Sequence, residues 1–261
     1  MTMANSEEII LIACLYLMVF LFGIVIGSFL NVCILRIPNK ESIAKERSHC
    51  MSCGYQLKWY DLFPLFSYIF LRGKCRKCKA HISCQYPIVE AANGIVYMLV
   101  FFINGWSIDS VIYCLFASAL IVLSVIDIRT FEIPFGINIF ILILGLIMTG
   151  LHLGDWVEHL IGLLCVSGFT WIIYQVSRGT AIGGGDVKLM AAAGLLLGWP
   201  KIILAFFIGC ILGSVIHVAR MKLTKVDHVL AMGPYLAAGC FIAAMWGDLF
   251  INWYIGSMTI K

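Results

Sequence analysis

Two aspartates stand beside apolar runs, where a carboxylate is costly. Asp127 directly follows the apolar run 111–126, and Asp186 follows the triglycine 183–185 and precedes a second apolar run. Acidic side chains at or near membrane depth are expensive to keep and are usually retained for a function. Two carboxyl groups that share a proton can activate water, as in aspartyl proteases. Asp127 and Asp186 are therefore the predicted catalytic pair.

The residues around Asp186 predict an active-site loop made of Gly183, Gly184, Gly185 and Lys188. Glycines permit unusual backbone dihedrals and let a substrate chain approach closely. Asp186 falls at the expected N-terminus of a helix, where the helix dipole favours a charged carboxylate. Lys188 adds a nearby positive charge.

More ordinary roles for these acids are open at this stage. Asp186 could serve only as a helix N-cap, and Asp127 could serve only as a partner for Arg129. Asp127 has no expected helix N-terminus beside it, so we expect it to be protonated more often than Asp186. Glu90 begins another expected helix, and it could line the same site or simply favour that helix N-terminus.

Four cysteines form a second candidate site. Cys50 and Cys53 make one Cys-x-x-Cys pair, Cys75 and Cys78 make another, and 21 residues separate the pairs. Four thiolates with this spacing suit a tetrahedral structural zinc ion. Disulfides and a redox role are the alternatives. We favour zinc because the orientation argued below puts these thiols in a reducing compartment and a redox site would need only one pair.

Composition indicates that the elements holding these residues lie in a membrane. The chain has 261 residues, of which 62% are hydrophobic and 12% are charged, about half the charge of an average soluble domain. Its mean hydropathy is +0.98. We therefore predict an all-α polytopic membrane protein with about eight transmembrane helices. They are expected at Ile9–Leu35, Ile88–Ile103, Ser110–Ile126, Pro134–Leu151, Val157–Val176, Val187–Trp199, Ile202–Arg220 and Val229–Tyr254; the sixth is short and either bent or packed inside the bundle.

Charge placement predicts the orientation of these helices. With both termini outside, only Lys201 and Lys261 of the 18 basic residues fall on the outer side, as the positive-inside rule requires. The basic residues are then topology signals and no nucleic acid is expected. Asp127, Asp186 and the four cysteines all fall on the cytoplasmic side of a cytoplasmic (inner) membrane.

Three domains follow from this arrangement. Residues 1–35 form the first transmembrane helix, 36–87 a small cytoplasmic zinc domain with four cysteine ligands, and 88–261 a seven-helix membrane protease domain. A domain of about 50 residues buries too small a core to be stable without a cross-link such as a bound metal ion. The predicted zinc ion would provide this cross-link.

An ordered series of short motifs resembles the type IV prepilin peptidases, a family of GxGD-type membrane aspartyl proteases that are also N-methyltransferases. The series comprises Gly27-Ser-Phe-Leu-Asn31, Arg47-Ser-His-Cys50, Trp59-Tyr-Asp-Leu-Phe-Pro64, Leu71-Arg-Gly-Lys-Cys75, Tyr86-Pro-Ile-Val-Glu90, Ile133-Pro134, Gly183-Gly-Gly-Asp186-Val-Lys188 and Gly233-Pro-Tyr-Leu236. The resemblance implies that Asp127 and Asp186 cut the leader from prepilins or pseudopilins of pilus, type II secretion or competence systems. It also implies N-methylation of the new N-terminal residue, usually phenylalanine, with S-adenosylmethionine. The sequence leaves the methyl-donor residues and the oligomeric state open.

Two other classes of function compete with this interpretation. An ion- or proton-coupled transporter with a zinc-stabilised cytoplasmic domain would distribute acids across membrane depth, often with inverted repeats; this chain shows two acids at matched depth and no repeat. A membrane-anchored zinc scaffold would tolerate loss of either aspartate.

Overall fold

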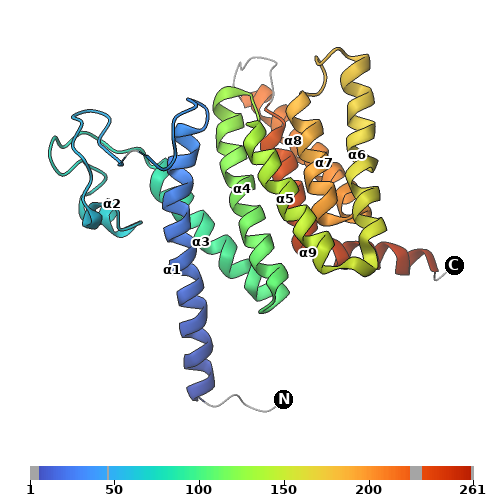
Figure 1. Ribbon diagram of the computed structural model, residues 1–261, viewed down its shortest axis with the longest axis horizontal. Helices are drawn as coiled ribbons and strands as arrows, with labels where there is room; N and C mark the ends of the chain where they lie inside the picture. The colour runs from blue at the N-terminus through green and yellow to red at the C-terminus, as the bar shows by residue number, and fades with distance from the viewer. Residues whose placement is uncertain (1–5, 46, 224–230, 260–261) are drawn as a thin grey trace. The chain divides into compact units, whose positions relative to one another are not determined.

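The computed structural model describes residues 6–45, 47–223 and 231–259, and in these ranges the chain is helical, with two isolated β-bridges and no strand (Figure 1). The all-α fold class is therefore confirmed. The helices are α1 (Ser6–Arg36), α2 (Phe66–Phe70), α3 (Gln85–Asn104), α4 (Ile108–Thr130), α5 (Phe135–Leu151), α6 (Trp156–Val176), α7 (Gly184–Leu197), α8 (Trp199–Leu223) and α9 (Gly233–Thr259), with short 3-10 turns at Trp59–Asp61 and Leu153–Asp155.

Six of the helices described, α1, α3, α4, α6, α8 and α9, are long and apolar enough to cross a membrane. This makes the chain a multi-pass membrane protein. Helices α5 and α7 have only 17 and 14 residues, so the predicted count of eight spans is approximate. The expected start of the last helix, Val229, lies outside the described residues, as does Lys261.

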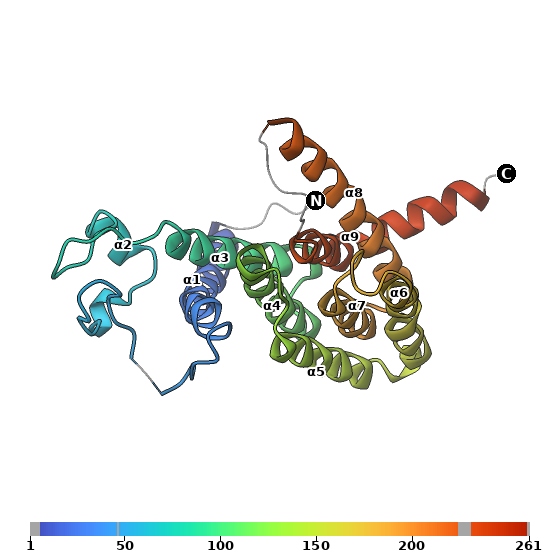
Figure 2. The same cartoon turned by 90° about the horizontal axis from the view of Figure 1, so that it is seen from above.

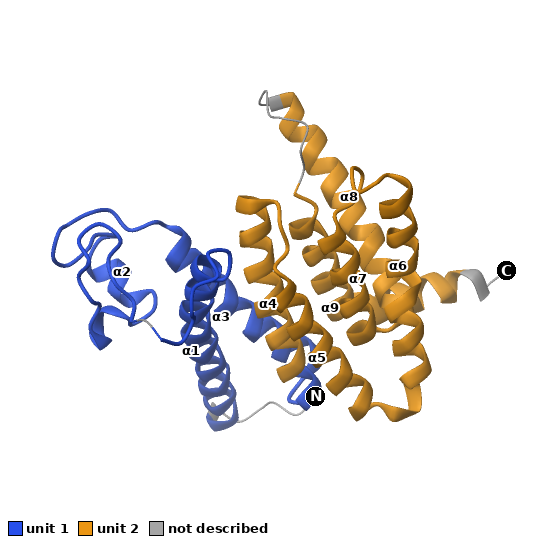
Figure 3. Cartoon of the chain, turned by 45° about the horizontal axis from the view of Figure 1, so that its top comes forward, with its two compact units in different colours: residues 1–110 blue, residues 111–261 orange. Residues whose placement is uncertain are grey.

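The chain divides into two compact units, residues 1–110 and 111–261 (Figure 3). The expected domain boundaries near residues 35 and 87 stay a prediction. In the first unit, α1 and α3 pack closely because small residues let the backbones approach. A Cβ on Gly23 would lie 2.8 Å from Cα of Gly94. Asn93 donates from Nδ2 to the carbonyl of Gly23 at 2.7 Å, which fixes the crossing.

The second unit contains most of α4 and all of α5 to α9, with α7 in the interior. Helix α7 packs against α5, α6, α8 and α9 (Figure 2). Leu189, Met190 and Ala193 on α7 are fully buried. A Cβ on Gly162 of α6 or on Gly194 of α7 would strike the other helix's backbone, so these two helices touch at glycines. The short apolar run 187–199 is thus packed inside the bundle. Asp186 lies just before this run, in the first turn of α7.

Candidate active site

Asp127 lies one turn before the end of α4 and is only 5% exposed. Its Oδ2 accepts the backbone N–H of Gly233 at 2.9 Å. Gly233 is the first residue of α9. A Cβ there would lie 2.6 Å from the same carboxylate oxygen, so the contact needs glycine. The hydrogen-bond partner of Asp127 is thus the N-terminus of α9 and not the side chain of Arg129.

This contact corrects one premise of the sequence argument. Asp127 was expected to lack a helix N-terminus and therefore to hold the proton more often than Asp186. The positive end of the α9 dipole lies directly at its carboxylate. Helix ends therefore act on both aspartates, and the expected order of protonation loses its basis. The sequence did not show this because Gly233 stands 106 residues further along the chain.

Asp186 is the third residue of α7 and is 8% exposed. Its Oδ2 accepts the N–H of Gly183, the residue before the helix, at 3.3 Å, which is half of a capping box. Its Oδ1 is buried and has no hydrogen-bond partner in the part of the chain that the structure describes. Capping explains one oxygen only. A buried carboxylate oxygen without a partner is unusual and is free to act on a bound molecule.

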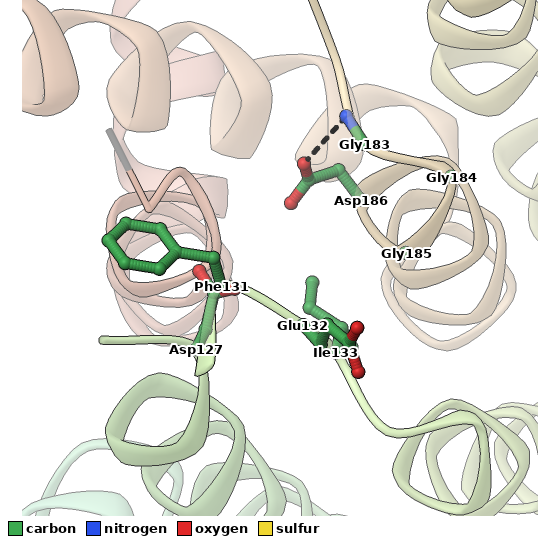
Figure 4. Close-up of a pocket in the computed structure, with 8 residues that line it drawn as sticks. All are labelled: Asp127, Phe131, Glu132, Ile133, Gly183, Gly184, Gly185 and Asp186. Carbon is green, nitrogen blue, oxygen red and sulfur yellow. Dashed lines mark hydrogen bonds between the residues drawn. The ribbon is translucent and has the colours of Figure 1, made fainter. Parts of the chain in front are cut away.

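Both aspartates line one cavity of about 270 Å³. It lies between the loop that joins α4 to α5 and the start of α7, and the two carboxyl groups are drawn in Figure 4. The lining residues are Asp127, Phe131, Glu132, Ile133, Gly183, Gly184, Gly185 and Asp186. The structure thus brings together two acids that lie far apart in the sequence.

The three glycines differ in what they do. None of them is among the positive-φ glycines of the chain, so the expected need for unusual dihedrals does not hold here. Close approach does matter at Gly185, where a Cβ would lie 2.9 Å from Cβ of Ile133. At Gly184 the nearest atom would be 3.6 Å away, on the Tyr174 ring, which is an ordinary contact. Gly185 therefore sets the distance between α7 and the loop before α5.

The sequence also predicts Lys188 and Glu90 at the site. Lys188 places its Nζ 5.2 Å from the centre of the Phe135 ring and does not line the cavity. Glu90 belongs to the first unit, where its Oε2 accepts the N–H of Leu65 at 2.8 Å. Its proposed place in the active site stays a prediction.

Sequence reasoning missed Asn138 as well as Gly233. Asn138 on α5 is buried, and its Nδ2 donates to the carbonyl of Gly185 at 3.5 Å. Its Oδ1 is buried without a partner among the described residues. A polar residue within the apolar run 134–151 was the available signal, because such residues face the inside of a bundle.

The four cysteines of the first unit form two turns of the same build. Gly54 donates to the carbonyl of Cys50, and Lys79 donates to the carbonyl of Cys75. Gly54 and Lys79 both have positive φ, at 67° and 61°. Each turn is flanked by an isolated β-bridge.

Sulfur geometry in this cluster suits a tetrahedral metal ion. The four Sγ atoms lie within 4.8 Å of one another, and those of Cys50 and Cys78 are 3.9 Å apart. Zinc–sulfur bonds of about 2.3 Å in a tetrahedron require sulfurs about 3.8 Å apart. Cys50, Cys53, Cys75 and Cys78 can therefore hold a metal ion.

The thiols also share their protons unequally. The backbone N–H of Cys78 lowers the pKa of Cys75 to about 6, because it, the N–H of Lys77 and the thiols of Cys50 and Cys78 together outweigh the opposite effect of burial. The N–H of Ala80 acts to lower the pKa of Cys78, but burial and the other three thiols outweigh it and raise that pKa to about 11. The first thiolate thus forms readily and the last does not, as in a set of coupled groups.

Two family models match the chain in succession. One, described as the bacterial peptidase A24 N-terminal domain, matches residues 21–103. The other, described as the type IV leader peptidase family, matches residues 114–218, which include both aspartates of the cavity.

Curated relatives cover most of the chain. A protein of Bacillus subtilis named prepilin leader peptidase/N-methyltransferase is 33% identical over 90% of this chain and 96% of its own length. A protein with the same name from Pseudomonas putida is 29% identical over 87% of this chain and 88% of its own length. Another from Legionella pneumophila is 30% identical over 93% of this chain and 95% of its own length. No solved structure matches the chain. These relatives all carry the peptidase name, so the transporter alternative has no support.

Proposed function

The chain belongs to the type IV leader peptidase family, and we propose that it is a membrane aspartyl endopeptidase that removes the leader peptide of type IV prepilins or pseudopilins. Asp127 and Asp186 are its catalytic pair. The observation that carries this proposal is the single cavity lined by both buried carboxyl groups.

Each aspartate has one oxygen held by a backbone N–H, from Gly233 or Gly183. In Asp186 the other oxygen has no partner among the described residues. A water molecule between the two carboxyl groups loses a proton to the ionised one as it attacks the scissile carbonyl carbon. The protonated partner donates to the carbonyl oxygen. Because the charges of two carboxylates that line one cavity repel, the state in which the pair shares one proton is favoured over the doubly ionised state.

The substrate backbone reaches this pair through the cavity that the three glycines line together with the aspartates. We place the cavity and the four cysteines on the cytoplasmic side of the inner membrane and both termini on the outer side, on the positive-inside argument given above. Cleavage then occurs where the apolar segment of a prepilin leaves the membrane.

The second activity that we propose is N-methylation of the new N-terminal residue, usually phenylalanine. The names of the relatives support it. S-adenosylmethionine, when bound, supplies the methyl group, and the structure assigns none of the described residues to it.

We propose that the four-cysteine cluster holds structural zinc, on the sulfur geometry and the matched turns described above. The cluster lies in the first unit and the aspartates lie in the second; the hydrolysis proposed above uses the two carboxyl groups alone.

Cleavage of a prepilin-derived peptide by purified, reconstituted protein tests the peptidase. We expect Asp127→Asn and Asp186→Asn each to lower the rate by about 10²–10⁴-fold, because each removes a proton-transferring group. Asp155→Asn is the matched control, since Asp155 is an exposed acid in a turn after α5. Normal cleavage by either cavity variant would remove the peptidase proposal.

A further inference from the structure

A third carboxylic acid, Glu132, lines the cavity together with the two aspartates (Figure 4). Unlike them, it is exposed. No described residue gives its carboxylate a hydrogen bond or an ion pair. The hydrolysis above needs two carboxyl groups, and the proposed function leaves this third group unused.

The backbone around Glu132 is held on both sides. Phe131 turns the chain at the end of α4 with φ of 54° and donates its N–H to the carbonyl of Asp127 at 2.9 Å. The hydroxyl of Thr130 donates to the carbonyl of Glu132 at 3.4 Å. On the other side, Ile133 packs directly against Gly185. Glu132 is therefore positioned between the elements that carry the catalytic pair.

The cavity has charges of one sign only. Its three ionisable lining residues are all acids, and none of the described basic residues lines it. Lys188 contacts the Phe135 ring instead. The buried Oδ1 of Asp186 also lacks a donor within the described ranges. A cavity lined by acids favours cationic ligand groups and disfavours anionic ones.

We propose that Glu132 is a specificity-determining residue that binds a lysine or arginine side chain of the substrate close to the scissile peptide bond. This inference rests on the proposed peptidase function and adds the chemical class of side chain that the site selects. Glu132 lies at the exposed side of the cavity, so it pairs with a side chain while the two aspartates act on the backbone.

The ordinary alternative is that Glu132 is a solvated loop acid. The preference of the enzyme for positively or negatively charged substrates separates the two interpretations. If Glu132 is only a solvated acid, its substitution leaves the ranking of substrates by kcat/KM unchanged. An acid that pairs with the substrate makes kcat/KM depend on the substrate's charge, and salt weakens that dependence.

The test uses the full-length, reconstituted protein and cleavable peptides that differ at one position. Lysine, glutamine or glutamate is placed in turn at each of the three positions on either side of the scissile bond. At one of these positions we expect the wild type to prefer lysine over glutamine by about fivefold, the size of a partly exposed ion pair. We expect Glu132→Gln to abolish this preference with unchanged cleavage of the glutamine peptide, and Glu132→Lys to prefer glutamate. Glu158→Gln, which neutralises an exposed acid in the first turn of α6, should behave as the wild type.

Two results would overturn the inference. If Glu132→Gln and Glu132→Lys keep the wild-type ranking, Glu132 does not contact the substrate charge, although the peptidase function stands. If Glu132→Gln slows all peptides equally, Glu132 acts in hydrolysis or structure and not in selection. A wild-type protein that cleaves none of the peptides contradicts the peptidase function itself, which is a different outcome from both.

Discussion

At the scale of single residues, each of the two proposed catalytic carboxylates accepts a hydrogen bond from one backbone N–H. Gly233 supplies it for Asp127 and Gly183 supplies it for Asp186. The two acids themselves could be predicted from sequence, because a carboxylate beside an apolar run is rare and costly. Gly183 could be predicted as part of the loop before Asp186, but the contact of Gly233 with Asp127 could not, since a backbone N–H has no sequence signature. Glu132 was missed because acids next to apolar runs are common in loops. Asn138 was missed although it lies within the apolar run 134–151, where a polar residue indicates the inside of a bundle.

Gly233→Ala should impair catalysis more than folding. The added Cβ would lie 2.6 Å from Oδ2 of Asp127, so the carboxylate must move out of the N–H bond. We expect kcat to fall by about 100-fold, as for a displacement of a catalytic group by about 1 Å, with little change in melting temperature. Gly136→Ala on α5 is the control, since a Cβ there meets no atom within 4 Å. Equal activity of the two variants would show that the Gly233 contact does not position Asp127.

At the scale of elements, the position of α7 decides the geometry of the site. The sequence predicted that the short helix at 187–199 is either bent or packed inside the bundle, because this apolar run is too brief to span a bilayer easily, and the structure shows the second arrangement. The sequence did not predict which of the three glycines allows α7 to approach the loop before α5, because all three stand next to one another before Asp186. In the structure only Gly185 touches the loop before α5, at Ile133.

Alanine substitutions should therefore separate two neighbouring glycines. Gly185→Ala should lower stability by about 1–3 kcal/mol through overpacking and slow cleavage at least tenfold as α7 shifts. Gly184→Ala should leave the melting temperature nearly unchanged, since its Cβ makes only an ordinary contact with the Tyr174 ring. Melting temperature and cleavage rate of the two variants in one detergent check this. Equal defects would contradict the close approach at Gly185.

The two cysteine turns act as one element through the metal that we propose. We expect about one zinc per chain by elemental analysis, and loss of it in a Cys75→Ser, Cys78→Ser variant. Cys84→Ser is the control, because Cys84 lies outside the four-sulfur cluster. Unchanged zinc content in the double variant would exclude this site.

Zinc affinity should also rise with pH. Between the pKa values of Cys75, about 6, and Cys78, about 11, the metal-free cluster keeps at least one proton. Binding must displace that proton, so affinity falls as pH falls through this window. Competition with a chelator at about pH 6 and about pH 8 measures the change, and equal affinities would contradict the assignment of thiolate ligands.

At the scale of the whole molecule, composition alone was enough to predict a multi-pass helical membrane protein, because lipid accepts only backbones that satisfy their own hydrogen bonds. Lys and Arg placement also put Asp127 and Asp186 at one depth, and they line one cavity in the structure. Depth does not determine which helices are neighbours. For that reason the contact of α9 with Asp127 and the interior place of α7 came only from the structure.

A kinetic double-mutant cycle tests most directly whether the two aspartates act as one unit. Cleavage rates are compared for wild type, Asp127→Asn, Asp186→Asn and the variant with both changes. Residues that act jointly are strongly non-additive, so the double variant should be no slower than either single variant. Losses that multiply, or a single variant that cleaves at the wild-type rate, would contradict joint action on one water molecule.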